Sequence, residues 1–114
     1  MSAVTLDRRL VLEARTRTPD GAGGYADDWQ PLGVLWASLH PGSGSLSRSG
    51  DSAAETSATR LRVTVRAAPL GAASRPAPGQ RFRAGDRSFA IEAVADSRGG
   101  AAFLTCHCRE ETSA

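Results

Sequence analysis

The 114-residue sequence predicts an all-β fold: a small barrel or sandwich of about six antiparallel strands with one long flexible loop. Apolar and polar residues alternate with a period of two in several short segments, which is typical of half-buried strands. Clusters of Gly, Pro, Asp and Ser separate these segments at the intervals expected of turns. No segment has the apolar spacing of an amphipathic helix, so an all-β fold is preferred over a mixed one.

The length and composition indicate one domain with a small core, spanning residues 1–114 and ending in a polar tail at 110–114. A domain of this size buries roughly two-thirds of the surface that its unfolded chain exposes. Hydrophobic residues make up 40% of the chain, but many of them are Ala and only 5% of the residues are aromatic. Large apolar side chains are therefore scarce.

The first two expected strands flank a turn. Residues 8–15 alternate in polarity, and the Pro-, Asp- and Gly-rich segment 18–24 predicts a turn or a long hairpin connection. A second extended region runs over residues 25–40, with an interruption expected at Pro31. Near its end, Trp36 lies on the face opposite the expected core, so we expect that face to be covered by the barrel itself or by a neighbouring subunit.

Residues 42–57 form the least typical segment, because loops longer than about 12–15 residues in compact domains are usually functional or disordered. Two interpretations stay open: a disordered surface loop, or a segment that becomes ordered on assembly.

Residues 59–66 form the clearest strand, with three arginines on its polar face: Arg60, Arg62 and Arg66. One interpretation is a solvated face whose charges prevent edge-to-edge aggregation. The other is a basic ridge that meets acidic groups of a partner.

The C-terminal part predicts short strands at residues 80–83, 87–94 and 101–109. Cys106 and Cys108 lie two apart on the last of these, with parallel side chains, so buried structural cysteines are favoured over a disulfide or a metal site. Three phenylalanines fit the inward pattern of a core: Phe82, Phe89 and Phe103. No aromatic side chain is expected beside the arginines of residues 59–66.

The sequence contains no motif for catalysis or for cofactor binding. The Gly-rich segments lack the context of a dinucleotide or phosphate loop, no Gly-x-Ser-x-Gly elbow is present, and only two His residues are available as bases or ligands. We therefore expect a protein that is not an enzyme and that has no catalytic residues, cofactor or metal.

Charge and hydropathy restrict the expected partners. The chain has no run of about 18 apolar residues and no apolar block near its N-terminus, so neither a membrane span nor a secretory signal is expected. The net charge is +2, and all fourteen basic residues are Arg. Nucleic-acid-binding proteins usually carry a larger positive excess, and Arg suits paired carboxylate contacts at protein interfaces.

The order of these features resembles the head–tail joining proteins of long-tailed bacteriophages, also called head-closure or stopper proteins. The resemblance covers about residues 6–109. It rests on an ordered set of segments rather than on one specific motif: Leu6–Glu13, Asp20-Gly21 with Gly23-Gly24, Trp29, Val34–Pro41, Thr59–Arg66, Gly85–Val94 and Cys106.

The resemblance implies a β-barrel subunit that assembles as a ring in the neck of a virion, either of a phage or of a phage-like gene transfer agent. Such a ring lies below the portal and its adaptor and above the tail terminator or tail tube. It completes the DNA-filled head, helps to retain the DNA and receives the tail. We expect assembly in the bacterial cytoplasm.

Two site hypotheses follow for such a ring. A subunit or partner interface is expected to use Trp36 and the basic ridge against acidic residues, with these members: Trp36, Arg60, Arg62, Arg66, Asp27 and Asp28. The long loop is expected to reach the axial channel, where its copies narrow the passage or contact packaged DNA through Arg48. The expected channel residues are Ser45, Arg48, Asp51 and Glu55. The alternatives are a small barrel that binds single-stranded nucleic acid, and a tail terminator within the same connector class.

Overall fold

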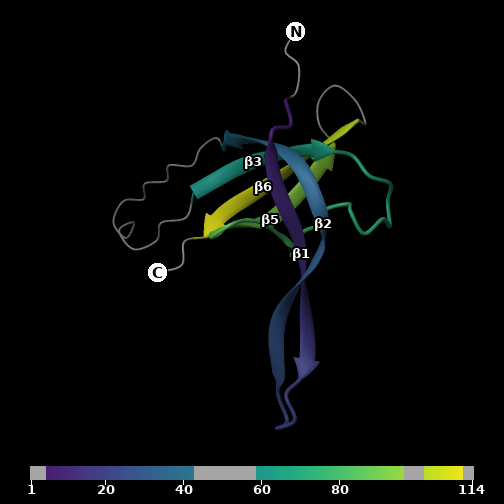
Figure 1. Ribbon diagram of the computed structural model, residues 1–114, viewed down its shortest axis with the longest axis vertical. Helices are drawn as coiled ribbons and strands as arrows, with labels where there is room; N and C mark the ends of the chain where they lie inside the picture. Colours follow the sequence, from purple (N-terminus) through teal and green to yellow (C-terminus); the bar gives the residue numbers. More distant parts are fainter. Residues whose placement is uncertain (1–4, 43–58, 97–101, 112–114) are drawn as a thin grey trace.

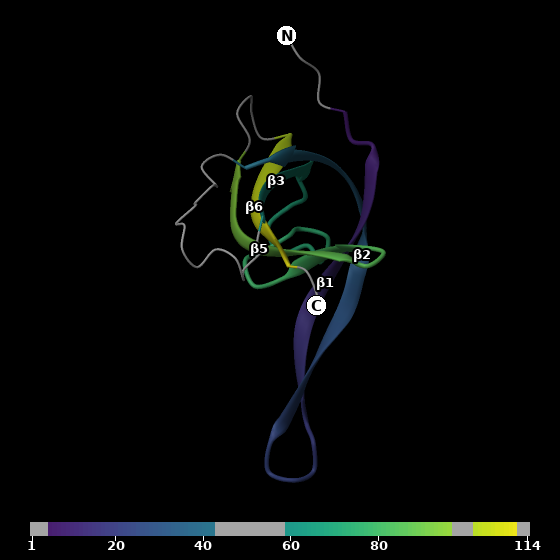
Figure 2. The same cartoon turned by 90° about the vertical axis from the view of Figure 1, so that its left-hand side faces the viewer.

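Six antiparallel strands close into a barrel in the computed structural model, which describes residues 5–42, 59–96 and 102–111. Their bounds are β1 (Arg8–Pro19), β2 (Tyr25–Pro41), β3 (Thr59–Arg66), β4 (Arg81–Ala84), β5 (Arg87–Asp96) and β6 (Phe103–Glu111). The order around the barrel is β1-β2-β3-β6-β5-β4, and Figure 2 shows the strands curving round a common centre. The all-β prediction is confirmed, and between the two predicted architectures the structure is a barrel.

Alternate residues of all six strands fill the barrel, as the period-two pattern predicts. Phe82 of β4 and Phe89 of β5 are the largest of these side chains, and they lie directly opposite each other in the β4–β5 pair. The buried apolar set is Leu10, Leu12, Ala37, Val63, Val65, Phe82, Phe89, Ile91, Leu104, Cys106 and Cys108. With only two aromatic rings in it, this core is small.

The strands β1 and β2 continue beyond the barrel as a two-stranded arm, residues 14–30 (Figure 1). The arm extends β1 from its predicted end at Arg15 to Pro19, because residues 16–19 pair with residues 25–28, so that Thr18 and Pro19 belong to the strand and not to the turn. The turn itself is shorter, and the Asp20 carboxylate accepts hydrogen bonds from the backbone N–H groups of Ala22 (2.8 Å) and Gly24 (3.0 Å). Gly21, with a φ of 83°, supplies a backbone conformation that side chains disfavour.

The interruption predicted at Pro31 is wrong, because β2 runs through it. Glu13 of β1 pairs with Pro31 and Leu12 pairs with Gly33, which leaves Leu32 as the extra residue of a β-bulge. A bulge tolerates the missing N–H of proline and adds twist to the strand pair. The bulge therefore lies where the arm leaves the barrel.

The remaining strands agree with the predicted ones within about two residues. Strand β3 matches the predicted range, and its start lies close to the end of β2, where the N–H of Gly42 donates to the carbonyl of Arg60 at 2.9 Å. A Cβ at Gly42 would stand 3.0 Å from the Arg60 backbone, so only glycine fits without displacement. The long loop predicted at residues 42–57 lies outside the described residues, except for Gly42.

Both cysteines are buried and free, as predicted. Burial raises the pKa of the Cys106 thiol to about 12 and raises the pKa of the Cys108 thiol as well. At neutral pH both thiols stay protonated and unreactive. Phe103, by contrast, was expected in the core but lies on the outer face of β6, because the inward positions of that strand belong to Leu104 and the cysteines.

The core predicts a large difference between two apolar truncations. Phe89→Ala should lower the free energy of unfolding by about 3–5 kcal/mol, because it removes a fully buried ring and leaves a cavity. Leu70→Ala is the matched control: that side chain is 83% exposed, so the change should stay within about 0.5 kcal/mol. Urea denaturation of the purified chain measures both, and equal losses would contradict the core described above.

Candidate interaction surface

A buried carboxylate joins the arm to the barrel. Glu13 of β1 is only 4% exposed, and it accepts hydrogen bonds from Nε of Arg81 at 2.7 Å and Nε of Arg83 at 2.9 Å. Both arginines belong to β4, where they flank the inward Phe82 and therefore point outward. Because Glu13 pairs with Arg81 at the last residue pair between β1 and β4, the cluster closes the barrel at the base of the arm.

Trp29 of β2 completes this cluster. The guanidinium of Arg81 stacks over its indole ring at 4.1 Å from the centroid, and that of Arg15 lies over the same ring at 5.3 Å. A stacked guanidinium keeps its edge N–H groups available to a carboxylate, so Arg81 serves Trp29 and Glu13 together. These contacts connect the arm, through Trp29, to β4 of the barrel.

The charge state of Glu13 depends on two opposing effects. Burial raises the pKa of its carboxyl group, but the hydrogen bonds and positive charges of Arg81 and Arg83 outweigh burial and hold the pKa below its ordinary value. Glu13 is therefore ionised at neutral pH, and the folded state favours the ionised form more than the unfolded chain does.

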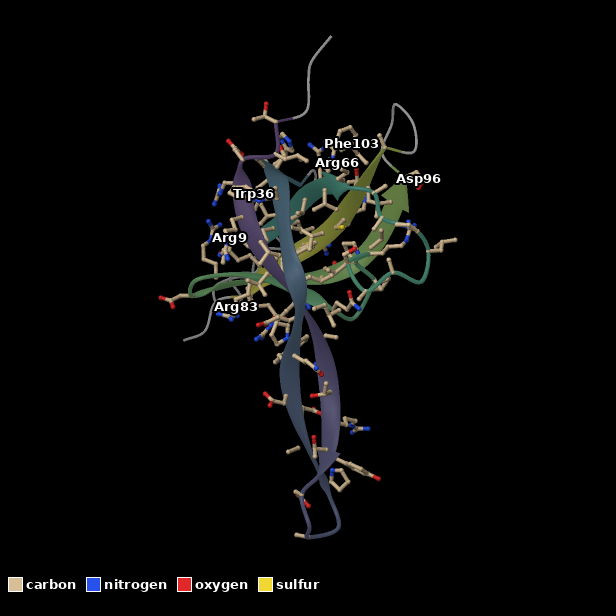
Figure 3. All side chains as sticks on the ribbon, turned by 45° about the vertical axis from the view of Figure 1, so that its right-hand side comes forward. Arg9, Trp36, Arg66, Arg83, Asp96 and Phe103 are labelled. Atoms are coloured by element: carbon tan, nitrogen blue, oxygen red, sulfur yellow. The ribbon has the colours of Figure 1, made fainter. Side chains whose placement is uncertain are left out.

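A second surface lies at the end of the barrel away from the arm. Here Arg9 and Trp36 are cross-strand partners, as are Arg66 and Phe103, and all four point outward (Figure 3). The guanidinium of Arg66 lies over the Phe103 ring at 5.4 Å. The expectation that no aromatic side chain lies beside the predicted basic ridge is therefore wrong, because strand pairing brings β6 next to β3.

An open groove of about 320 Å³, which we call the Trp36 groove, crosses this surface. Its lining is apolar except for one arginine and one serine, and it consists of Leu6, Val34, Leu35, Trp36, Arg66, Ala67, Ala68 and Ser74. Trp36 is 53% exposed and Val34 is 48% exposed. Trp36 thus lies on an outward apolar face that nothing in the described part of the chain covers.

The three arginines of the predicted ridge have different surroundings. Arg60 forms an exposed ion pair with Glu92 of β5 at 3.3 Å, and Arg109 of β6 lies 3.5 Å from the same carboxylate. Arg60 and Arg109 face each other across the β3–β6 pair, so Glu92 relieves a like-charge contact. Arg62 lies between His40 and His107 in the neighbouring strands.

The acidic members of the predicted interface lie on the arm. Asp27 forms an exposed ion pair with Arg17 at 3.4 Å, and Asp28 accepts a hydrogen bond from the backbone N–H of Trp29. Within one chain the structure does not bring these aspartates to the ridge on β3 (Figure 1). The predicted channel residues Ser45, Arg48, Asp51 and Glu55 lie outside the described residues.

In residues 5–42, 59–96 and 102–111 there is no group of three His, Cys, Asp or Glu side chains that could hold a metal ion. The same ranges contain no helix that could span a lipid bilayer.

The sequence did not reveal the cluster at the base of the arm. Glu13 and Arg81 are 68 residues apart, so no local pattern connects them. The available signal was weak: Glu13 is the only acid within residues 8–15, and Trp29 closely precedes the proline that marks the bulge.

Comparisons with known proteins identify the class to which this barrel with an arm belongs. Residues 1–111 match the model of a family described as phage head completion protein. A chain in a solved structure described as the virion of a native gene transfer agent (GTA) particle is 46% identical, with a TM-score of 0.75; the match covers 98% of this chain and 100% of that one. No match was found among curated proteins.

Protein SF1141 from Shigella flexneri 2a, solved in solution, is 22% identical with a TM-score of 0.65, and the match covers 96% of each chain; this likeness shows the fold alone. The chain belongs to the phage head completion protein family. The resemblance seen in the sequence is thus confirmed, as is the expectation that the protein is a structural component of a phage or phage-like virion.

The cluster predicts a large effect of a nearly isosteric change. Glu13→Gln should lower the free energy of unfolding by about 1.5–3 kcal/mol, because it removes the charge that two guanidinium groups bind. Glu110→Gln is the matched control: its bidentate partner Arg87 is exposed, and the loss should be about 1 kcal/mol or less. Equal losses in urea denaturation would contradict a special role for Glu13.

The Glu13 carboxyl group also predicts how the stability of the protein changes at acid pH. Since the pKa of Glu13 is lower in the folded state than its ordinary value of 4.5, its contribution is complete above that value and is lost as the pH falls through the folded-state pKa. Wild type should therefore lose more stability than Glu13→Gln between about pH 5 and pH 3. Parallel pH profiles of the two proteins would show that Glu13 is not the group responsible.

Proposed function

We propose that the protein is a ring-forming stopper of the virion neck, which joins the portal and adaptor of the DNA-filled head to the tail and helps to retain the DNA. The observation that carries the proposal is the 46% identity, over almost the whole of both chains, to a chain of the GTA particle. The proposed partners are further copies of the chain, the portal adaptor above, the tail terminator or tail tube below, and packaged DNA in the channel. The proposed subunit is a single domain over residues 1–114.

The surface of the barrel supports an assembled state. A ring needs heterologous contacts, in which one patch of a subunit meets a different patch of the next. The chain offers two such features, the Trp36 groove and the arm, at different ends of the molecule (Figures 1 and 3). The basic ridge of Arg60, Arg62 and Arg66 is proposed as part of a partner interface, in which Arg62 and Arg66 are available without breaking an ion pair seen in the structure.

A structural role also agrees with the chemistry of the described residues. The cysteine thiols are buried and protonated, and the exposed His40 lies 2.8 Å from the hydroxyl of Ser38, a buried residue of β2. No acidic side chain lines the Trp36 groove. We therefore propose a binding surface and no active site.

One observation favours a second candidate, a barrel that binds single-stranded nucleic acid. Arg9, Trp36, Arg66 and Phe103 place aromatic rings beside arginines, as stacking surfaces for bases require. Titration with a fluorescent oligonucleotide separates the candidates. The stopper should bind weakly, whereas tight binding that falls steeply with salt, and that Trp36→Ala abolishes, would favour the second candidate.

Deletion of the gene in the particle-producing strain tests the stopper role directly. We expect heads without tails in electron micrographs and at least a tenfold loss of nuclease-protected DNA, both restored by the wild-type gene. Closed heads carrying tails of abnormal length would indicate a tail terminator instead. Normal particles would contradict any role in head completion.

A further inference from the structure

Exposed large apolar side chains in the described part of the chain gather at two places. Val34 and Trp36 line the Trp36 groove, and Leu70 lies in the connection that follows the groove residue Ala68. Tyr25 is separate from them: it is 62% exposed and lies where β2 begins, beside the turn at the tip of the arm. One apolar groove and one apolar projection therefore face solvent.

The groove and the tip cannot meet within one molecule. The arm projects from one end of the barrel, and Trp36 and Arg66 lie toward the other end (Figure 3). Any contact between them must join two chains, with the tip of one chain against the groove of the next. Such a contact is heterologous: repeated in one direction it leaves a free tip and a free groove at the ends, and it closes in a ring when the rotation between successive copies brings the last chain back to the first.

The arm has the properties of a segment that binds a partner. Beyond Arg15 and Trp29 its two strands pair only with each other, and both of its faces are exposed. A two-stranded ribbon without a third strand is marginally stable in water. Here the cluster of Glu13, Arg81 and Trp29 fixes its base, so the arm is already oriented when a partner arrives.

Charge complementarity indicates which partner fits. Residues 16–30 contain three aspartates and one arginine, so the outer arm is net negative. The arginine, Arg17, lies over the Tyr25 ring at 5.2 Å from its centroid and forms an ion pair with Asp27, which compensates its charge. Around the groove the charges are positive, with Arg66 in the lining and Arg9 beside Trp36. Apart from these two arginines, the groove is lined by apolar side chains, which do not bind a phosphate backbone. The tip of the arm fits better, because the Tyr25 ring matches the apolar lining and the neighbouring aspartates match the two arginines.

We propose that the tip of the arm docks into the Trp36 groove of a second copy of this chain. Tyr25 covers the exposed faces of Val34 and Trp36, and Asp20 and Asp27, which flank it, approach Arg66 and Arg9. The proposal rests on the proposed ring and names the contact that holds it together. It places the long axis of each subunit along the circumference of the ring, since the two contacts lie at its ends.

Cysteine cross-linking in assembled particles tests this contact. A chain carrying both Pro19→Cys and Ser74→Cys replaces the wild type in the producing strain, and purified particles are treated with a short bismaleimide. Pro19 is the exposed cross-strand partner of Tyr25, and Ser74 is an exposed residue of the groove lining, so the docking side chains themselves are kept. The native cysteines are buried, so they do not react. Because each subunit then has one reactive group at each end, we expect a ladder of covalent multimers on a denaturing gel.

The matched control is Ala26→Cys with Ser74→Cys. Ala26 is exposed and adjacent to Tyr25, but its side chain points to the opposite face of the arm. This chain should give at least tenfold less multimer. The single substitution Pro19→Cys should give no product beyond a dimer.

The outcomes separate this proposal from the proposed function. Particles that contain the chain but give no ladder, or whose Pro19→Cys cross-links to a different virion protein, would overturn the docking and leave the stopper role intact. If the double variant does not enter particles, Tyr25→Ser decides. It removes no core contact and should lower the number of copies per particle at least tenfold, whereas Ala26→Ser should not. Wild-type copy number with Tyr25→Ser overturns the docking.

Discussion

Glu13 forms ion pairs with Arg81 and Arg83 where β4 pairs with β1, and this strand pair closes the barrel. Strand β4 has four residues, and only three residue pairs connect it to β1. Backbone hydrogen bonds over so short a contact are few, and beneath it the core contributes a single ring from β4, that of Phe82. Two charge-assisted hydrogen bonds to the buried carboxylate of Glu13 strengthen the pairing of β4 with β1, where the backbone contributes few hydrogen bonds.

The same cluster determines where the arm begins and how it leaves the barrel. Beyond Glu13, β1 no longer pairs with β4. The residues of β2 before Ala37 do not pair with β3, so in the arm β1 and β2 pair only with each other. The bulge at Pro31 and Leu32 adds twist at this point, and Trp29 connects the ribbon to Arg81. A small core thus supports a long projection, because the projection is held at its base rather than packed along its length.

The period-two pattern of the sequence was sufficient to predict the six strands, the buried cysteines and most inward residues, Phe103 excepted, because each of these depends only on local alternation. The arm was underestimated for a reason that is also local. Pro19 and the glycines that follow it are typical of a turn, but the turn needed only residues 20–24, and Pro19 was still able to pair with Tyr25. Likewise Pro31 was expected to interrupt β2, whereas a bulge accommodates it.

The surface was the least predictable part. Sequence alone identified Trp36 and the arginines of β3 as outward residues, and it assigned the chain to its family through an ordered set of short segments. It did not place Phe103 beside Arg66, join Glu13 to Arg81 or separate the arm from the groove. Alternation along a strand determines which face a side chain takes; which strands become neighbours, and so which side chains meet across the barrel, is decided only when the sheet closes.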